Sequence, residues 1–305
     1  MTRRPCTPAA RCGLPALCGV CRLIAKDPAF AAGFAPRPAV PVWFDQPGRT
    51  VPIPAPPPVV FAPTKPRAVV TVAAGVEGRR LHAASGAHLR RYAAEADADL
   101  IVLDWPGLPG LGVTSKFQLS RVLDLGYEQV AHVDADTLCR PGAVDLFDLC
   151  PPDEFGILDE LPWHHSGDGV VAAYHRFRAR SGLAPLSPLP WYGNAGVMVF
   201  GQAHRAVLDP PAELWVEDSG IGRHCSEQNL TVARLHDGAG GVRVRLLPVA
   251  ANLQSWTCRA CGGEPFRAAP RDAIFHWSSG GGGGGGARTQ RAADIAAWAA
   301  RFPWP

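Results

Sequence analysis

Apolar runs alternate with helical patterns through the middle of this chain. The β-branched run at 68–74 is continuous, as in a strand buried on both faces, and the segment that follows it has a helical pattern. A second strand and helix follow in the same order, and then a third strand that ends before residue 134. This pattern predicts strands at 68–74, 99–104 and 129–133, and helices at 81–95 and 115–125, the second of which ends before Gly126. This order favours an α/β fold with a mostly parallel, doubly wound sheet.

The pattern becomes looser after residue 138. A glycine-punctuated turn leads into an apolar strand within 191–200, and polar residues at 226–229 begin a helix that extends to 235. Short strands are expected at 243–249 and 273–277, and a terminal helix at 288–301. No internal repeat is visible.

The chain divides by composition into two parts. Residues 1–66 are rich in cysteine, alanine and proline, with a proline tract over 36–66. Such a tract favours extended polyproline backbone and cannot supply a sheet interior. We therefore expect an N-terminal extension or surface strap at 1–66 and the folded catalytic domain at 67–305.

The composition narrows the class of protein. The 305 residues are 47% hydrophobic and 19% charged, which is typical of a globular protein with ample core. The formal net charge of +3 is too small to indicate nucleic acid or an anionic membrane as a partner. No continuous apolar run is long enough for a membrane span or a secretory signal, so we expect a cytoplasmic protein.

Two carboxylates follow the third predicted strand. Asp134 and Asp136 are two residues apart, and in a strand such residues point to the same face. Ligands of doubly wound sheets bind beyond the carboxyl ends of the strands, where this pair lies. Carboxylate oxygens are preferred by Mg²⁺ and Mn²⁺, ions that commonly share their shell with substrate phosphates. The pair therefore predicts a divalent metal site beside a diphosphate.

The motifs in their order resemble those of a glycosyltransferase of the GT-A fold, close to the family 8 type. The resemblance covers about residues 68–280. It depends on Lys116, on His132-Val133-Asp134-Ala135-Asp136-Thr137-Leu138, on Tyr192-Gly193-Asn194-Ala195-Gly196-Val197-Met198-Val199, on Ser226-Glu227-Gln228-Asn229-Leu230 and on Phe275-His276-Trp277.

This resemblance implies transfer of a hexose from a nucleotide diphosphate donor of the UDP or GDP type. It implies that the anomeric configuration is retained, and that the acceptor is a hydroxyl of an unknown glycan, protein or small molecule. The implied metal ligands are Asp134, Asp136 and His276, and an imidazole beside two carboxylates suits Mn²⁺ better than Mg²⁺. The implied donor-binding residues are Lys116, Ala73, Asp134, Ala135 and Gly196, and the residues expected at the reacting sugar are Asn194, Glu227 and Gln228.

The chain departs from the family pattern at two places. Family members usually follow the late histidine with a glycine, a lysine and an aromatic residue that bind the diphosphate, whereas here Trp277-Ser278-Ser279 precedes seven glycines at 280–286. Backbone N–H groups of that run, or Arg288, would then replace the lysine. The alternative is that the glycine run is a disordered hinge. The loop at 227–228 reads Glu-Gln where the family often has Asp-Gln or Asp-Asp.

The nine cysteines suggest a second, structural metal. Two C-x-x-C pairs have the spacing of zinc knuckles, and the N-terminal cysteines alone form a local set for zinc or an iron–sulfur cluster. Free thiols are the alternative, and the odd total argues against a full disulfide framework. The candidate ligands are Cys6, Cys12, Cys18, Cys21, Cys258 and Cys261.

Two other functions fit part of the sequence. A sugar nucleotidyltransferase would have a Gly-rich, basic loop after the first strand, and residues 73–80 match this in part. A non-catalytic binding protein would use the cysteine region as a zinc ribbon. His164, His165 and Asp168 form a further polar cluster, which could be a wall on the acceptor side, a lid or simply a solvated loop.

Overall fold

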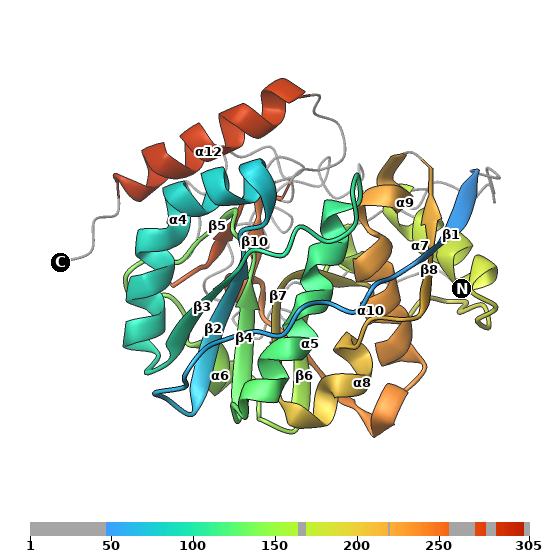
Figure 1. The fold of residues 1–305 in the computed structure, drawn as a ribbon, viewed down its shortest axis with the longest axis horizontal. Coiled ribbons are helices and arrows are strands. Elements are labelled where there is room, and N and C mark those ends of the chain that lie inside the picture. The colour runs from blue at the N-terminus through green and yellow to red at the C-terminus, as the bar shows by residue number, and fades with distance from the viewer. Residues whose placement is uncertain (1–46, 164–168, 219, 256–271, 279–284, 302–305) are drawn as a thin grey trace, which may run out of the picture.

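A six-stranded sheet forms the centre of the fold (Figure 1). The computed structural model describes residues 47–163, 169–218, 220–255, 272–278 and 285–301. The strands lie in the order β3, β2, β4, β7, β6 and β9 across the sheet. Their bounds are β2 Arg67–Val72, β3 Asp99–Leu103, β4 Gln129–Val133, β6 Glu154–Asp159, β7 Gly193–Phe200 and β9 Arg243–Leu247. Only β7 is antiparallel to its neighbours, which confirms the predicted α/β class with a mostly parallel sheet.

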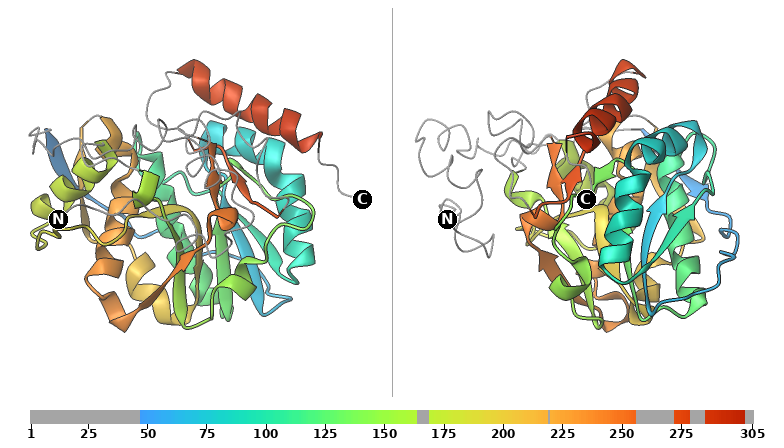
Figure 2. Two further views of the ribbon diagram at one scale, coloured as in Figure 1. Left: turned by 180° about the vertical axis from the view of Figure 1, so that it is seen from behind. Right: turned by 90° about the vertical axis from the view of Figure 1, so that its left-hand side faces the viewer.

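Side chains that alternate along the strands enter two cores, one on each face of the sheet. Val70 of β2 belongs to the larger core and Val69 to the smaller one, as the two-residue period of a strand requires. Helices cover both faces, as the two views in Figure 2 show. The larger core is covered by η1 Gly112–Gln118, α5 Leu119–Val122, α7 Gly169–Arg180, α8 Arg205–Leu208 and α10 Ser226–His236; the smaller is covered by α4 Gly75–Glu95 and α6 Leu146–Leu149.

A second, three-stranded sheet brings distant parts of the chain together. It consists of β10 Leu253–Gln254, β11 Phe275–His276 and β5 Thr137–Leu138. In the antiparallel pair of β11 and β5, His276 lies opposite Thr137. Helix α12, Gly285–Ala299, lies beside α4 (Figure 1) and places Trp298 against Phe275 and Trp277 of this region. The late strand and the terminal helix were predicted. The pairing of β11 with β5 brings His276 to the site.

The segment just before the sheet lies on the folded domain. Strand β1, Gly48–Pro52, pairs with β8, Glu213–Glu217, and Val51 and Ile53 are buried in the larger core. Farther along, the backbone N–H of Thr64 donates to Asp99 over 2.8 Å. A strand was not expected in the proline tract, but β1 forms a separate two-stranded ribbon, in which proline is tolerated. The domain boundary at residue 66 stays a prediction.

Other differences from the expected elements are local. The segment expected as one helix at 115–125 consists of η1, α5 and η2 Leu123–Leu125, and Gly126 ends it with a positive φ of 84°. The first long helix begins at Gly75, six residues earlier than residue 81. The remaining short elements are η3 Leu161–Trp163, η4 Gln202–His204, α9 Gly220–His224, η5 Ala239–Gly241 and η6 Val249–Ala251. Among the described residues, no helix combines the length and apolar character that a membrane span requires.

Candidate metal and donor site

The two aspartates lie on the turn that joins β4 to β5. Strand β4 ends at Val133, and the N–H of Thr137 donates to the carbonyl of Asp134 over 3.1 Å, which closes the turn. The turn, rather than the alternation within a strand, therefore presents both carboxylates. Its position at the carboxyl end of a central strand is where doubly wound sheets bind ligands.

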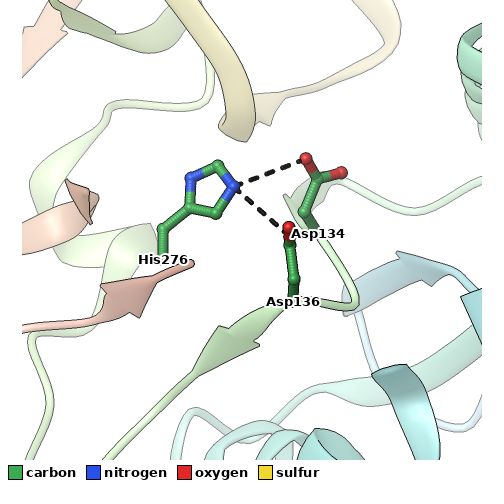
Figure 3. A group of neighbouring side chains, drawn as sticks. All are labelled: Asp134, Asp136 and His276. Carbon is green, nitrogen blue, oxygen red and sulfur yellow. Dashed lines mark ion pairs between the residues drawn. The ribbon is translucent and has the colours of Figure 1, made fainter. Parts of the chain in front are cut away.

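His276 completes a group of three potential metal ligands with Asp134 and Asp136 (Figure 3). Its Nε2 lies 3.3 Å from Oδ1 of Asp136 and 3.8 Å from Oδ2 of Asp134. Two ligand atoms that each lie about 2.1 Å from one ion can be at most about 4.2 Å apart, so these separations allow a shared cation. Two carboxylates and one imidazole also form a suitable donor set for Mn²⁺. The three residues that the sequence predicted as ligands therefore converge and fit a divalent ion.

Asp134 is held by two basic side chains. Lys116 Nζ donates to its Oδ2 over 3.0 Å, and His132 Nε2 donates to its Oδ1 over 3.0 Å. Burial acts to raise the pKa of Asp134, but the charge of Lys116 and the hydrogen bond from His132 outweigh burial and lower that pKa. Asp134 is therefore ionised and oriented. His132 is on the same face of the chain as Asp134, two residues away, but the sequence analysis gave it no role.

Asp136 has a partner from the last helix. Arg291 Nη1 of α12 donates to its Oδ2 over 2.6 Å, and the side chain of Asp136 is only 10% exposed. Burial acts to raise the pKa of Asp136, and the interactions with His276 and Arg291 lower it. The remaining oxygen, Oδ1, faces His276. Arg291 was not predicted as a site residue. The sequence analysis named Arg288 instead, as a replacement for the family's diphosphate-binding lysine, and the side chain of Arg288 lies outside the described residues.

Lys116 joins the aspartate pair to the strand and helix on the other side of the site. Besides Asp134, its ammonium reaches the carbonyl of Ala195 at 3.1 Å and Oε1 of Glu227 at 3.5 Å. Burial acts to lower the pKa of Lys116, but the charges of Asp134 and Glu227 raise it well above its usual value. Burial raises the pKa of Glu227, whose Oε2 has no hydrogen-bond partner among the described residues. The two residues thus form a buried ion pair beside the predicted metal ligands.

Asn194 and Gln228 meet at a buried carboxylate that the sequence analysis missed. Their side-chain amides donate to Glu160 over 3.0 Å each, and Gln254 donates to the same carboxylate over 2.9 Å. The N–H of Ala195 donates to Oε1 of Gln228 over 3.1 Å. Glu160 follows β6 and is 3% exposed. A charged residue directly after an apolar strand was the available signal, but its amide partners come from distant segments.

Three small residues were expected among the donor-binding residues. Ala73 follows β2 and is buried, with its N–H donating to the carbonyl of Leu103. Ala135 lies on the metal turn, and its carbonyl accepts a hydrogen bond from Ser85. Gly196 lies on β7, where its carbonyl accepts from the N–H of Asp134 over 2.8 Å. Gly196 and Ala135 are thus next to the metal ligands, and donor contacts at all three positions stay a prediction.

The loop expected for nucleotidyl transfer is not a loop here. Helix α4 begins at Gly75, so residues 75–80 of the partial match are helical. Their glycines and arginines cannot wrap around a phosphate as a flexible Gly-rich loop would. This feature weakens the nucleotidyltransferase alternative.

Several sequence predictions fall on residues that the structure does not describe. They are the cysteines Cys6, Cys12, Cys18, Cys21, Cys258 and Cys261, the cluster of His164, His165 and Asp168, and glycines 280–284. Cys139, Cys150 and Cys225 are described and are free thiols.

Comparison with known proteins does not by itself assign a family. No model of a known protein family matches the chain, and no curated protein sequence matches it. Among solved structures, a glycosyltransferase involved in glycosylation of the major capsid of PBCV-1 is 11% identical, with a TM-score of 0.45 over 75% of this chain and 98% of that chain. Mouse xyloside xylosyltransferase 1 is 14% identical, with a TM-score of 0.41 over 72% and 99%. The galactosyltransferase LgtC is 13% identical, with a TM-score of 0.43 over 78% and 97%. Similarity at this level carries no argument about activity.

Proposed function

We propose that this protein is a metal-dependent glycosyltransferase that uses a nucleotide diphosphate sugar as donor. One observation carries the proposal: Asp134, Asp136 and His276 converge at the carboxyl end of a central strand, as the family 8 resemblance of the sequence implies. Lys116 lies on the same site and adds a positive charge beside the carboxylates. Acidic and imidazole ligands next to a fixed ammonium suit a divalent cation together with a diphosphate.

Each residue of the site has a task in this scheme. A bound cation would offset the negative charge that develops on the departing nucleoside diphosphate. Asp134 and Asp136 are kept ionised by Lys116, His132 and Arg291, so both can act as ligands without first losing a proton. Glu227 is buried beside Lys116, and its Oε2 has no hydrogen-bond partner among the described residues. Gln228 and Asn194 are fixed in orientation by Glu160, which limits how a sugar can lie against them.

The finer features of the reaction follow from the resemblance. We propose a UDP or GDP donor, Mn²⁺ in preference to Mg²⁺, transfer of a hexose, and retention of the anomeric configuration. The acceptor is a hydroxyl group of a glycan, a protein or a small molecule. The location in the cytoplasm stays a prediction.

A donor panel tests the proposal. The purified chain is incubated with UDP- and GDP-sugars, with and without Mn²⁺, and released nucleoside diphosphate is measured together with the anomeric configuration of the released or transferred sugar by NMR. The expected result is Mn²⁺-dependent release from one donor class, at least about a hundredfold slower in Asp134→Asn and Asp136→Asn. Asp148→Asn removes an exposed acid on α6 and serves as the control.

The same assay includes the rival reaction. Nucleoside triphosphate with a sugar 1-phosphate is supplied in parallel, and pyrophosphate is measured. Release of pyrophosphate, with no turnover of any nucleotide sugar to nucleoside diphosphate, would establish nucleotidyl transfer and reject the proposal.

A further inference from the structure

Four buried side chains form a hydrogen-bonded chain that ends at His276. Glu160 accepts from Nδ2 of Asn194 over 3.0 Å, and Oδ1 of Asn194 accepts from Nδ2 of Asn252 over 2.9 Å. Oδ1 of Asn252 in turn lies 2.9 Å from Nδ1 of His276. All four residues are less than 9% exposed, and Asn252 has no exposed surface. They come from four separate segments, so the tertiary fold creates the chain.

The direction of every hydrogen bond in this chain is fixed. The backbone N–H of Gly196 donates to Oδ1 of Asn194 over 2.9 Å, and a backbone N–H can only donate. The oxygen of Asn194 must therefore face Gly196 and Asn252, which leaves its NH₂ group for Glu160. Asn252 must then present its own NH₂ group to Asn194 and its oxygen to His276.

The consequence for His276 is a defined tautomer. Because Asn252 offers an oxygen, Nδ1 of His276 must carry the proton. In the neutral ring, Nε2 then has a free lone pair, and Nε2 is the atom that lies 3.3 Å from Asp136 and 3.8 Å from Asp134. A cation bound between the two carboxylates would therefore meet this lone pair directly.

We propose that Asn252 is a positioning residue, which holds His276 as the Nδ1–H tautomer with Nε2 directed at the cation site. The inference rests on the proposed metal site and adds a residue that the sequence analysis did not single out. A second hydrogen bond on the far ring nitrogen orients a metal-binding histidine and increases its basicity, and its loss typically costs about 10–100-fold in metal affinity. Glu160 and Asn194 act one step farther back, by keeping the amide of Asn252 in a single orientation.

Burial supports this role over a purely structural one. An amide in this place costs free energy unless both of its ends are hydrogen-bonded, whereas an apolar side chain of similar size would fill the space without that requirement. Both ends of Asn252 are bonded, one of them to a predicted metal ligand. Asn252 therefore contributes its hydrogen-bonding groups, and not only the volume of its side chain.

The test measures the tautomer and the metal affinity separately. Long-range ¹H–¹⁵N correlation spectra of the metal-free full chain, at mildly alkaline pH, report which nitrogen of His276 carries the proton. Mn²⁺ affinity is measured by calorimetry with Mn²⁺ alone. The variants are Asn252→Leu, which removes both hydrogen bonds, and Asn252→Asp, which keeps an oxygen facing Nδ1. Gln129→Leu removes another buried amide, on the strand that precedes the aspartates but bonded to the carbonyl of Cys150, and is the matched control.

The expected result is an Nδ1–H tautomer in the wild type, in Asn252→Asp and in Gln129→Leu. Asn252→Leu should lose this preference and bind Mn²⁺ about 10–100-fold more weakly, while Asn252→Asp loses less and Gln129→Leu stays at the wild-type affinity. An Nε2–H tautomer in the wild type overturns the inference, as does Asn252→Leu with an unchanged tautomer and affinity. If Asn252→Leu does not fold, the tautomer of the wild type and the Mn²⁺ affinity of Asn252→Asp decide whether the inference holds.

Failure of the proposed function has a different signature. A wild type that shows the Nδ1–H tautomer but binds no Mn²⁺ would contradict the metal site, while the spectrum would still confirm how Asn252 orients His276.

Discussion

The ring of His276 packs directly on Gly196, so closely that a Cβ atom at position 196 would lie 2.1 Å from Cε1 of that ring. The carbonyl of the same glycine accepts the N–H of Asp134 over 2.8 Å. Strand β7 therefore contacts both sides of the metal site at one residue. The sequence analysis named Gly196 as a donor-binding residue, which stays a prediction. In the structure, its missing side chain leaves room for a predicted metal ligand.

Gly196→Ala should displace His276 and weaken Mn²⁺ binding by at least about tenfold, because any larger residue forces the ring to move. Overpacking of this kind also destabilises a fold by about 1–3 kcal/mol. Calorimetry with Mn²⁺ measures the first effect and urea unfolding the second. Gly112→Ala is the control, since a Cβ there meets nothing within 4 Å. Unchanged Mn²⁺ affinity in Gly196→Ala would show that His276 is not a ligand.

Lys116→Met should destabilise the protein in the absence of metal. The substitution leaves Asp134 and Glu227 without their shared ammonium, and breaking a buried ion pair costs about 3 kcal/mol. Mn²⁺ should recover part of the loss, because the ion supplies positive charge at Asp134. The measurement is urea unfolding with and without Mn²⁺, and Lys65→Met, which removes an exposed ion pair, should change little. Equal stability of Lys116→Met and the wild type would rule out this electrostatic role.

Arg291→Met should increase the affinity for Mn²⁺ in the absence of nucleotide. The guanidinium is bonded to Asp136, so it competes with the ion for the same carboxylate. A neighbouring positive charge opposes the ion by on the order of 1 kcal/mol even at high dielectric, or about fivefold in affinity. Arg301→Met removes an equal charge just beyond the end of α12 and is the control. A lower Mn²⁺ affinity in Arg291→Met would instead show that Arg291 helps to place Asp136.

We predict that the protein loses stability in mild acid because of the half-buried His236. Burial, assisted by the charge of Arg178, lowers the pKa of His236 to about 4, and its Nδ1 lies 2.6 Å from the hydroxyl of Tyr174. Its pKa in the unfolded chain is about 6.5. Between these two values the unfolded state binds more protons than the folded state, so the free energy of unfolding falls as the pH decreases from about 6.5 to 4 and is unaffected by this group above that range.

The measurement is urea unfolding of the wild type and His236→Gln over this pH range. Four other histidines, His82, His132, His175 and His204, also have lowered pKa values, so both proteins lose stability in acid. The difference between them isolates His236, and His236→Gln should show the shallower dependence. Parallel curves would mean that His236 titrates in the same way in the folded and unfolded chain.

The sequence predicted the elements that have a strong local pattern and the ligands that follow them. Strands β2, β3 and β4 are mostly apolar, and Asp134 directly follows the last of them. Strand β6 was missed because Gly156 interrupts its apolar run. This glycine is explained only by the tertiary fold, since a Cβ there would lie 2.9 Å from Sγ of Cys150.

The residues that support the ligands could not be read from the sequence. Glu160, Asn252 and Arg291 are separated from their partners by many residues, and each resembles an ordinary surface or turn residue when it is taken alone. What identifies them is burial together with a polar partner, and both appear only after the small sheet of β5, β10 and β11 has formed. The local pattern therefore predicts the metal ligands, and the tertiary fold determines which atoms of those ligands are available.

The central claim is that Asp134, Asp136 and His276 bind one divalent cation that holds a nucleoside diphosphate. It is tested most directly by titrating the protein with Mn²⁺ and counting the free ion by electron paramagnetic resonance, with UDP or GDP absent or present. We predict one bound Mn²⁺ per chain, bound more tightly with the nucleotide, and loss of this binding in Asp136→Asn and His276→Ala. A wild type that leaves Mn²⁺ free under both conditions, or variants that bind it equally well, would contradict the account.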